Sequence, residues 1–358
     1  MSINVALLSM RKLEIRGQGI PKYINELYNN AKKIGAGYGV HMEKLYPDKY
    51  YKILGDALSF ELDTIINRKN WENFDIIHLP NGFFRAHRIP EDKKYIVTIH
   101  DVKPISVKTN NVRYLIKDRI WRLVAFQRNM IHNTKLANLV IVDSTQTKDE
   151  VLSLGKDRKY VKVVNLGIDK RFATGDMDVS NHKIYTVGYI GSFATNKNVG
   201  FAIRSMKSVD KNTGIRFNVW GAKTYDYAYL KSLSEFNSQV IFNGFAPENN
   251  LVKIYDSFDV FVFPSLYEGF GLPILEAQAR GLPVIIYKYG KIPKEVRKYC
   301  LEAESSEHMA QIIEGLKENG YNEKLRKKAT EYARSFTWEK TAKETLKLYK
   351  KVHEGLFA

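Results

Sequence analysis

The stretch from Asp259 to Val284, DVFVFPSLYEGFGLPILEAQARGLPV, constrains the fold of this 358-residue chain more than any other. Asp259 to Phe263 is rich in β-branched and aromatic residues and is followed by Pro264, which predicts a buried strand that runs into a loop. Pro273 suits the first turn of a helix, because its ring fixes φ. A helix is therefore expected to begin near Leu272. The order of strand, loop and helix predicts an α/β fold.

The loop between this strand and this helix has the composition of a binding site. Gly269 and Gly271 lack side chains, so the backbone there can approach a ligand closely. The free N–H groups and the positive dipole end of the helix suit an anion or a set of hydroxyl oxygens. Glu268 and Glu276 can address one cleft from different depths. These features predict a ligand with hydroxyls at one end and phosphate in the middle; the alternative is a tight turn with two solvated glutamates.

Length and composition set the frame. The chain is long enough for two domains, and 44% hydrophobic with 12% aromatic residues is a globular composition. Ile3 to Met10 is typical of a first strand rather than of a signal peptide, and no apolar run approaches the ~20 residues of a membrane helix. The single Cys300 excludes an internal disulfide and a cysteine-rich metal site. We therefore expect a cytoplasmic protein.

The chain is strongly basic. Its 56 Lys and Arg residues exceed its 39 Asp and Glu residues by 17, which predicts affinity for nucleotide phosphates, an anionic membrane or nucleic acid. Arg113 to Arg128 interleaves basic and apolar residues and so predicts a basic amphipathic helix. Two interpretations of this helix remain open. It is a domain helix with a solvated basic face, or it makes peripheral contact with an anionic membrane.

The N-terminal part follows a strand, glycine turn and helix pattern. Gly17 and Gly19 lie between a strand at Ile3 to Met10 and a helix at Tyr23 to Ile34. This turn could cradle a phosphate, or it could be a plain connection. A dinucleotide fingerprint would place a third glycine where Lys22 stands, which argues against binding of NAD.

Two further hydrophobic runs, at 74–79 and 94–102, are typical of strands that a parallel sheet buries on both faces. The second run ends in His100 and Asp101. Ligands of open α/β sheets bind beyond the carboxyl ends of the strands, so this pair is well placed to touch a substrate. A structural role for His100 is the alternative.

A second domain is predicted after a polar, turn-rich linker at 173–182. The alternation of strands and helices restarts at 184, and Lys197 comes just before a helix. Gly244 lies in a turn after a later strand. The chain ends in an amphipathic helix at 336–353.

The segment around Glu268 resembles the signature of the retaining GT-B glycosyltransferases of the glycosyltransferase group 1, or GT4, family, which includes sucrose synthases and bacterial mannosyltransferases. In that family two glutamates, separated by seven residues as here, flank a Gly-Phe-Gly loop. The resemblance implies that the first glutamate and the loop hold the donor sugar, and that the second holds the ribose. The donor-binding residues it implies are Gly17, Gly19, Lys197, Gly244, Glu268, Gly269, Phe270, Gly271, Leu272 and Glu276.

The resemblance also implies a catalytic set of His100, Lys197 and Glu268. The histidine would approach the donor sugar, and the lysine would neutralise the donor diphosphate. The family often has Arg-Lys-Asn at this point, whereas this chain has Asn196 before the lysine. Arg16 and Lys22 are candidates to replace the missing arginine. No metal or other cofactor is implied.

The implied architecture is GT-B, with two Rossmann-like α/β domains that face each other across a cleft. Residues 1–172 would form the acceptor-binding domain and residues 173–358 the domain that binds the nucleotide sugar. The final helix, at 336–353, would cross back to the first domain.

The implied reaction is the transfer of a hexose, with retention, from a nucleotide-diphosphate sugar to a glycan, a lipid-linked acceptor or another hydroxyl. Attack from the face of the leaving group is favoured over a covalent intermediate on Glu268. Three alternatives remain: a sugar-nucleotide epimerase of the same fold, a dinucleotide oxidoreductase and a nucleic-acid-binding protein. The last rests on net charge only, and no specific nucleic acid is expected.

Overall fold

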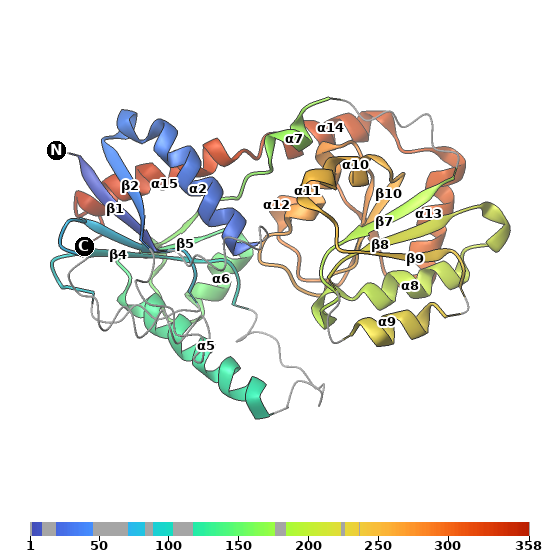
Figure 1. Cartoon of the computed structure of the whole chain (residues 1–358), viewed down its shortest axis with the longest axis horizontal. Helices are drawn as coiled ribbons and strands as arrows, with labels where there is room; N and C mark the ends of the chain where they lie inside the picture. Colours follow the sequence, from blue (N-terminus) through green and yellow to red (C-terminus); the bar gives the residue numbers. More distant parts are fainter. Residues whose placement is uncertain are drawn as a thin grey trace. The chain divides into compact units, whose positions relative to one another are not determined.

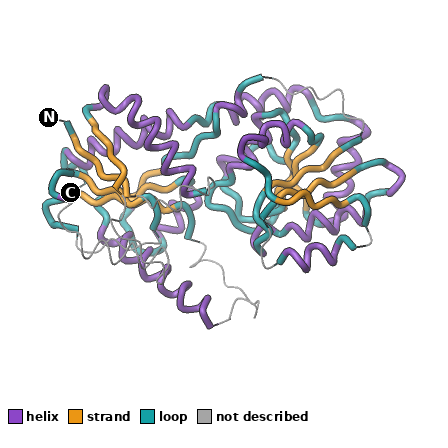
Figure 2. The backbone as a smooth tube through the Cα atoms, viewed as in Figure 1, coloured by secondary structure: helices purple, strands orange, loops and turns teal. Residues whose placement is uncertain are grey.

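A computed structural model describes residues 2–8, 19–45, 71–82, 89–102, 117–175, 184–222, 226–235 and 237–357, with the backbone alone at 117–126 and at 211. The chain divides into two compact units (Figure 1). The first unit comprises Met1–Gly167 and Trp338–Ala358, and the second comprises Ile168–Thr337. Each unit holds one sheet with helices around it (Figure 2).

The first unit contains a six-stranded sheet in the order β2-β1-β3-β4-β5-β6, and every pairing in it is parallel. Its strands are β1 (Ile3–Leu8), β2 (Val40–Leu45), β3 (Ile76–Leu79), β4 (Lys94–Ile99), β5 (Leu139–Val142) and β6 (Val161–Val163). Its helices are α2 (Ile20–Ile34), η1 (Gly35–Tyr38), α5 (Lys117–Leu136), α6 (Thr145–Leu152), η4 (Arg158–Tyr160) and α15 (Trp338–His353).

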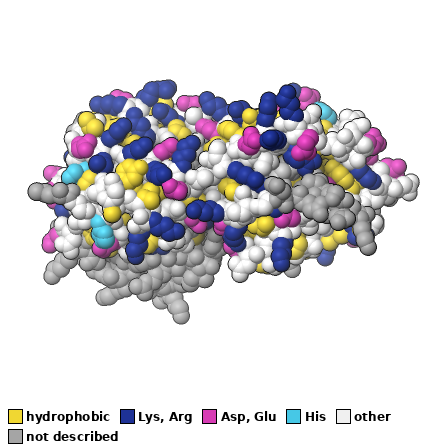
Figure 3. All heavy atoms as spheres, turned by 90° about the horizontal axis from the view of Figure 1, so that it is seen from above, with side chains coloured by type: hydrophobic (Ala, Val, Ile, Leu, Met, Phe, Trp, Pro, Cys, Tyr) yellow, Lys and Arg dark blue, Asp and Glu magenta, His cyan; other side chains and the backbone are white. Residues whose placement is uncertain are grey.

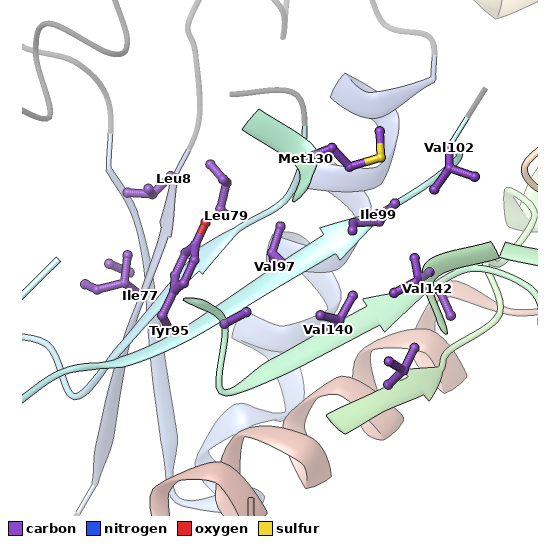
Figure 4. Close-up of a cluster of buried hydrophobic side chains, with 14 of the residues drawn as sticks. Leu8, Ile77, Leu79, Tyr95, Val97, Ile99, Val102, Met130, Val140 and Val142 are labelled. Atoms are coloured by element: carbon purple, nitrogen blue, oxygen red, sulfur yellow. The ribbon is translucent and has the colours of Figure 1, made fainter. Parts of the chain in front are cut away.

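The core of the first unit lies on both faces of this sheet. On one face, Met130 of α5 joins a buried cluster with Ile77, Val97 and Val140 (Figure 4). On the other face α2 packs against the C-terminal helix α15, whose Leu346 is fully buried. Because side chains alternate along a strand, β3 and β4 contribute to both faces.

The second unit contains a parallel six-stranded sheet in the order β12-β11-β10-β7-β8-β9. Its strands are β7 (Thr186–Ile190), β8 (Arg216–Trp220), β9 (Val240–Gly244), β10 (Val260–Phe263), β11 (Val284–Tyr287) and β12 (Leu301–Ala303). Its helices are α7 (Lys170–Ala173), η6 (Thr195–Lys197), α8 (Val199–Ser208), η7 (Lys211–Thr213), α9 (Tyr227–Leu233), η8 (Glu248–Asn250), α10 (Leu251–Asp256), α11 (Leu272–Ala279), α12 (Lys294–Arg297), α13 (Ser306–Asn319) and α14 (Glu323–Arg334).

The segment that leaves the first unit is bonded within the second. The guanidinium of Arg171 pairs with Glu248 at 3.2 Å, and the buried Arg280 donates to the carbonyl of Thr174 at 2.6 Å. Arg334 donates to the carbonyl of Gly175 at 2.9 Å. These bonds make residues 168–175 part of the second compact unit.

The predicted fold class is confirmed: two parallel α/β sheets are present, and the C-terminal helix packs on α2. No helix among the described residues is long and apolar enough to cross a membrane. Helix α5 covers part of the predicted basic helix, but Arg113 and the side chains up to residue 126 lie outside the described residues. In Figure 3, Lys and Arg side chains spread over the visible face with acidic side chains among them.

Candidate active site

Strand order places two loops of the second unit side by side. β7, the first strand of this sheet, lies between β10 and β8, so the order of the strands reverses at β7 and β10. Ligands of open α/β sheets bind at such a switch point, beyond the carboxyl ends of the strands. The loops that follow β7 and β10 are joined by a backbone hydrogen bond in which the N–H of Leu266 donates to the carbonyl of Asn196 at 2.8 Å.

Side chains from the first loop strengthen this junction. The amide of Asn196 donates to the carbonyl of Tyr267 at 3.3 Å, and the amide of Asn198 donates to the carbonyl of Pro264 at 3.2 Å. Asn198 has a φ of 50°, the one positive φ outside glycine among the described residues. The two asparagines thus fix the loop on both sides of Lys197.

Lys197 and Glu268 form an ion pair across these two loops. The ammonium Nζ lies 2.6 Å from Oε1 and 2.8 Å from Oε2 of the carboxylate. The side chain of Lys197 is 22% exposed and that of Glu268 is 10% exposed. The pair is therefore partly shielded from water, yet a ligand at this edge of the sheet can reach it.

The glycine loop presents its backbone to the same edge. Gly271 is the N-cap of α11 with a φ of 104°, a conformation that glycine adopts without strain, and no side chain caps the helix. Helix α11 begins at Leu272, as predicted. The side chain of Phe270 is buried, with its ring 6.1 Å from that of Phe336. Pro273 has no N–H, and the N–H of Ile274 donates to the carbonyl of Gly271 at 3.1 Å, so the N–H of Leu272 and the positive end of the helix dipole are what this turn can offer an anion.

Glu276 lies in the second turn of α11 and is buried, with 6% exposure. One of its carboxylate oxygens accepts a hydrogen bond from the hydroxyl of Tyr255 at 3.0 Å. Burial raises the pKa of Tyr255 well above its usual value, and the negative charge of Glu276 raises it further. Tyr255 therefore stays protonated and holds the carboxylate in place as a hydrogen-bond donor.

Gly244 lies at the other side of this sheet. It is the last residue of β9, an edge strand, and its carbonyl accepts from the N–H of Gly221 at 2.7 Å. Strand β8 separates it from β7, so the strand order does not bring it to the junction of Lys197 and Glu268. The next residue, Phe245, is 55% exposed and offers an aromatic face.

The candidate residues of the first unit lie at the carboxyl edge of its own sheet. Gly19 is the N-cap of α2 with a φ of 66°, while Gly17 lies outside the described residues. Nδ1 of His100 lies 2.6 Å from Oδ2 of Asp143, and Nε2 lies 2.9 Å from the carbonyl oxygen of Pro80. Both ring nitrogens of His100 thus have partners within this unit.

The two candidates for the missing arginine also belong to the first unit. Lys22 lies in the first turn of α2, and Arg16 lies outside the described residues. Position 196 itself has a structural function, because its asparagine ties the two loops together.

Comparisons with known proteins concern the family and the fold of this chain. The model of the glycosyl transferases group 1 family matches residues 177–336, which include Lys197 and both glutamates. Residues 177–336 belong to the glycosyltransferase group 1 family. This glycosyltransferase is 25% identical to the O-antigen chain mannosyltransferase B of Escherichia coli over 77% of this chain and 74% of that protein. It is 29% identical to an uncharacterised glycosyltransferase of Methanocaldococcus jannaschii over 87% and 85% of the two chains.

Solved structures share the GT-B fold of this glycosyltransferase. A sucrose-phosphate synthase from Thermosynechococcus elongatus superposes with a TM-score of 0.76 at 18% identity and covers 99% of this chain and 100% of its own. Anabaena HepE, solved in complex with UDP and glucose, superposes with a TM-score of 0.68 at 14% identity and covers 98% and 100% of the two chains. These two likenesses extend over nearly the whole chain and show a shared fold.

Sequence reasoning missed several residues that contact the candidate site residues or their loops. Asp143 follows β5, and the rule that ligands gather beyond parallel strands could have pointed to it. The loop contacts of Asn196 and Asn198 require knowledge of which strands are neighbours. Tyr255 gives no signal of its own, because a tyrosine on an apolar helix face is usually part of the core.

Proposed function

We propose that this glycosyltransferase is a retaining hexosyltransferase, which moves a hexose from a nucleotide-diphosphate sugar to a glycan, a lipid-linked acceptor or another hydroxyl. The observation that carries this proposal is the Lys197–Glu268 ion pair, with contacts of 2.6 and 2.8 Å, at the switch point of the second sheet. The name of the E. coli relative, a mannosyltransferase, supports a hexose as the transferred group.

Each part of the donor finds a matching group in the second unit. Glu276 accepts the ribose hydroxyls, which are common to a nucleotide sugar and the free nucleotide. Glu268 and the backbone of residues 269–272 accept the hydroxyls of the sugar. Lys197 and the positive dipole end of α11 face the diphosphate, where positive charge is needed. The aromatic Phe245 beside Gly244 is suited to the base.

The chemistry follows from the charge that develops. As the bond between the sugar and the diphosphate breaks, negative charge grows on the leaving phosphate and positive charge grows on the sugar. Lys197 stabilises the negative charge on the phosphate, and the carboxylate of Glu268 stabilises the positive charge on the sugar. The positive charge of Lys197 beside Glu268 lowers the nucleophilicity of this carboxylate. Attack by the acceptor from the face of the leaving group therefore accounts for retention better than a covalent intermediate does.

We place acceptor binding in the N-terminal domain. The basic segment Arg113 to Arg128 would bring that domain to an anionic membrane if the acceptor is linked to a lipid. Sedimentation with anionic vesicles at two salt concentrations tests this contact, because added salt weakens an attraction between surface charges. A chain that ignores the vesicles at low salt would favour a soluble glycan acceptor.

Turnover tests the proposed reaction. UDP-, GDP- and dTDP-hexoses are incubated with the enzyme and a set of hydroxyl acceptors, and release of the nucleoside diphosphate is followed. NMR of the product then reports the anomeric configuration. Acceptor-dependent release with retention is the expected result. A new epimer of the donor, formed without any acceptor, would instead identify an epimerase.

A further inference from the structure

His78 on β3 is buried, and His100, which directly follows the neighbouring strand β4, is half-buried; their partners differ in kind. His78 on β3 lies 2.6 Å from the hydroxyl of Tyr349 through Nδ1 and 2.8 Å from the hydroxyl of Thr98 through Nε2. A hydroxyl can donate or accept, so a neutral imidazole satisfies both contacts. Burial lowers the pKa of His78 to about 3, with a further contribution from the charge of His100. His78 is therefore neutral at physiological pH.

His100 has two partners that can only accept. The carboxylate of Asp143 lies 2.6 Å from Nδ1, and the carbonyl of Pro80 lies 2.9 Å from Nε2. A neutral imidazole has one N–H and can donate to one of them only. Both contacts are hydrogen bonds only when both ring nitrogens carry protons. The geometry around His100 is thus that of an imidazolium.

The surroundings of His100 favour this charged form. Burial by itself lowers its pKa, but the charge and hydrogen bond of Asp143, the bond to Pro80 and the charge of Asp101 raise it, and the net shift is upward. The side chain is 14% exposed and that of Asp143 is 3% exposed, so water screens their attraction weakly.

Two further groups near the ring, both among the described residues, are neutral. Tyr23 of α2 meets the ring edge-on, with centroids 4.7 Å apart. Its pKa is raised by burial, and its hydroxyl is bonded to Thr98 at 3.0 Å, so it stays neutral. His78 on β3 is neutral as well.

We propose that His100 is held as a permanent imidazolium and that Asp143 is the positioning residue that keeps it charged. His100 then supplies a fixed positive charge at the carboxyl end of β4 and neither gives nor takes a proton during turnover. Its contribution to catalysis rests on the proposed glycosyl transfer, in which negative charge grows on the leaving phosphate. Its protonation state does not rest on that function.

NMR of the whole chain labelled with 15N in the histidine rings tests the protonation state. His100→Gln and His78→Gln assign the two signals, and Asp143→Asn gives a second route to that of His100. We expect two protonated nitrogens for His100 and one for His78, both unchanged between pH 5.5 and 8.0. A bare nitrogen on His100, or a titration of its ring within this range, would overturn the proposal.

The Asp143→Asn variant tests the positioning role. Loss of the carboxylate charge should lower the pKa of His100, so that its ring titrates in the NMR experiment. Turnover of this variant should then fall as pH rises past the new midpoint. The pH profiles of turnover for the wild type and for His100→Gln should lack this fall. A merely structural role for Asp143 predicts the same loss of turnover at every pH and contradicts the proposal.

The two experiments separate the failure of this inference from the failure of the proposed function. If no nucleotide sugar supports turnover, the proposed transfer is wrong, and the ring nitrogens still decide the charge of His100. If transfer occurs and the wild-type ring titrates, the inference fails alone.

Discussion

The carboxyl edges of the two sheets each hold a pair of opposite charges, and the two pairs differ in what they leave for a ligand. In the second unit, Lys197 meets Glu268 with a flexible ammonium that has three N–H donors in all. In the first unit, both N–H groups of His100 are used, one by Asp143 and one by the carbonyl of Pro80. The Lys197–Glu268 pair can exchange partners when the nucleotide sugar binds, while the His100–Asp143 pair can only supply charge.

The difference follows from the elements that carry each pair. Lys197 and Glu268 lie on two loops that touch each other beyond the strands. His100 directly follows the end of β4, and Asp143 follows β5, the next strand in the sheet. Neighbouring parallel strands fix the distance between residues at their ends, so the His100–Asp143 pair is as rigid as the sheet. The pair of Lys197 and Glu268 can therefore exchange partners because it lies on loops, and the charge of His100 is fixed because it lies at the end of a strand.

The largest effect is expected from Lys197→Ala. It should lower kcat with the best donor by roughly 10²- to 10³-fold, as loss of one group that stabilises charge in a transition state does, and change KM much less. Steady-state kinetics measures both. Lys207→Ala, on the exposed face of α8 in the same unit, is the matched control. A change in kcat of less than about twofold would mean that another residue neutralises the diphosphate.

Glu276→Ala should weaken the binding of the nucleotide sugar and of the free nucleoside diphosphate alike, by roughly 1.5 to 3 kcal/mol. The ribose is common to both ligands, so calorimetry should find the same loss for each. Tyr255→Phe keeps the carboxylate of Glu276 but removes the hydroxyl that donates a hydrogen bond to it. This variant should lose about 1 kcal/mol of binding free energy. Unchanged affinity for the free nucleotide would place Glu276 outside the site.

The pH dependence of the free energy of unfolding tests whether His78 stays neutral in the folded first unit. The pKa of His78 falls to about 3 in the folded chain, so below its unfolded pKa of about 6.5 only the unfolded chain binds this proton. The stability from its neutral form is complete above pH ~6.5 and should fall by about 1.4 kcal/mol per pH unit on acidification. Urea unfolding between pH 5 and 8 should show this slope in the wild type but not in His78→Gln.

The same pH series includes a control variant, and His100 contributes to it with a pH dependence opposite to that of His78. Tyr349→Phe keeps the titrating ring of His78 and should show the wild-type slope at lower stability. The raised pKa of His100 contributes stability below its unfolded pKa, and this stability is lost as pH rises through the folded pKa. Equal slopes in the wild type and in His78→Gln would show that His78 takes up its proton without unfolding.

The smallest effect is expected at position 196. Asn196→Ala removes one side-chain hydrogen bond between the two loops, worth about 1 kcal/mol, and should lower kcat/KM by roughly fivefold. Asn196→Arg introduces the residue that the resemblance to the family leads us to expect, and it should strengthen binding of the diphosphate. If the alanine variant lost as much kcat as Lys197→Ala, the loop junction rather than the charge of Lys197 would dominate catalysis.

The parts of the fold that follow local patterns could be predicted from the sequence. The apolar runs at β4 and β10 lie where expected, and α11 begins at Leu272 after a glycine in a left-handed conformation. These features depend on neighbouring residues only, and parallel strands buried on both faces are continuous apolar runs.

The contacts within the candidate site could not be predicted in this way. The ion pair between Lys197 and Glu268 joins residues 71 positions apart, and it exists because β7 and β10 are neighbours in the sheet. The bond between His100 and Asp143 spans 43 positions and depends in the same way on the neighbouring β4 and β5. Strand order is a property of the whole fold and is absent from any short motif.

The melting temperature of the whole chain with nucleotide sugars tests the central claim most directly. UDP-, GDP- and dTDP-sugars, and their free nucleoside diphosphates, are compared for the wild type and Glu276→Gln. A ligand at 100 times its Kd stabilises the folded state by about 2.7 kcal/mol, so one sugar nucleotide and its diphosphate should raise Tm clearly in the wild type. The variant should show a much smaller rise with both. No rise with any donor, or an equal rise in the variant, would contradict a donor site built on Glu276, Glu268 and Lys197.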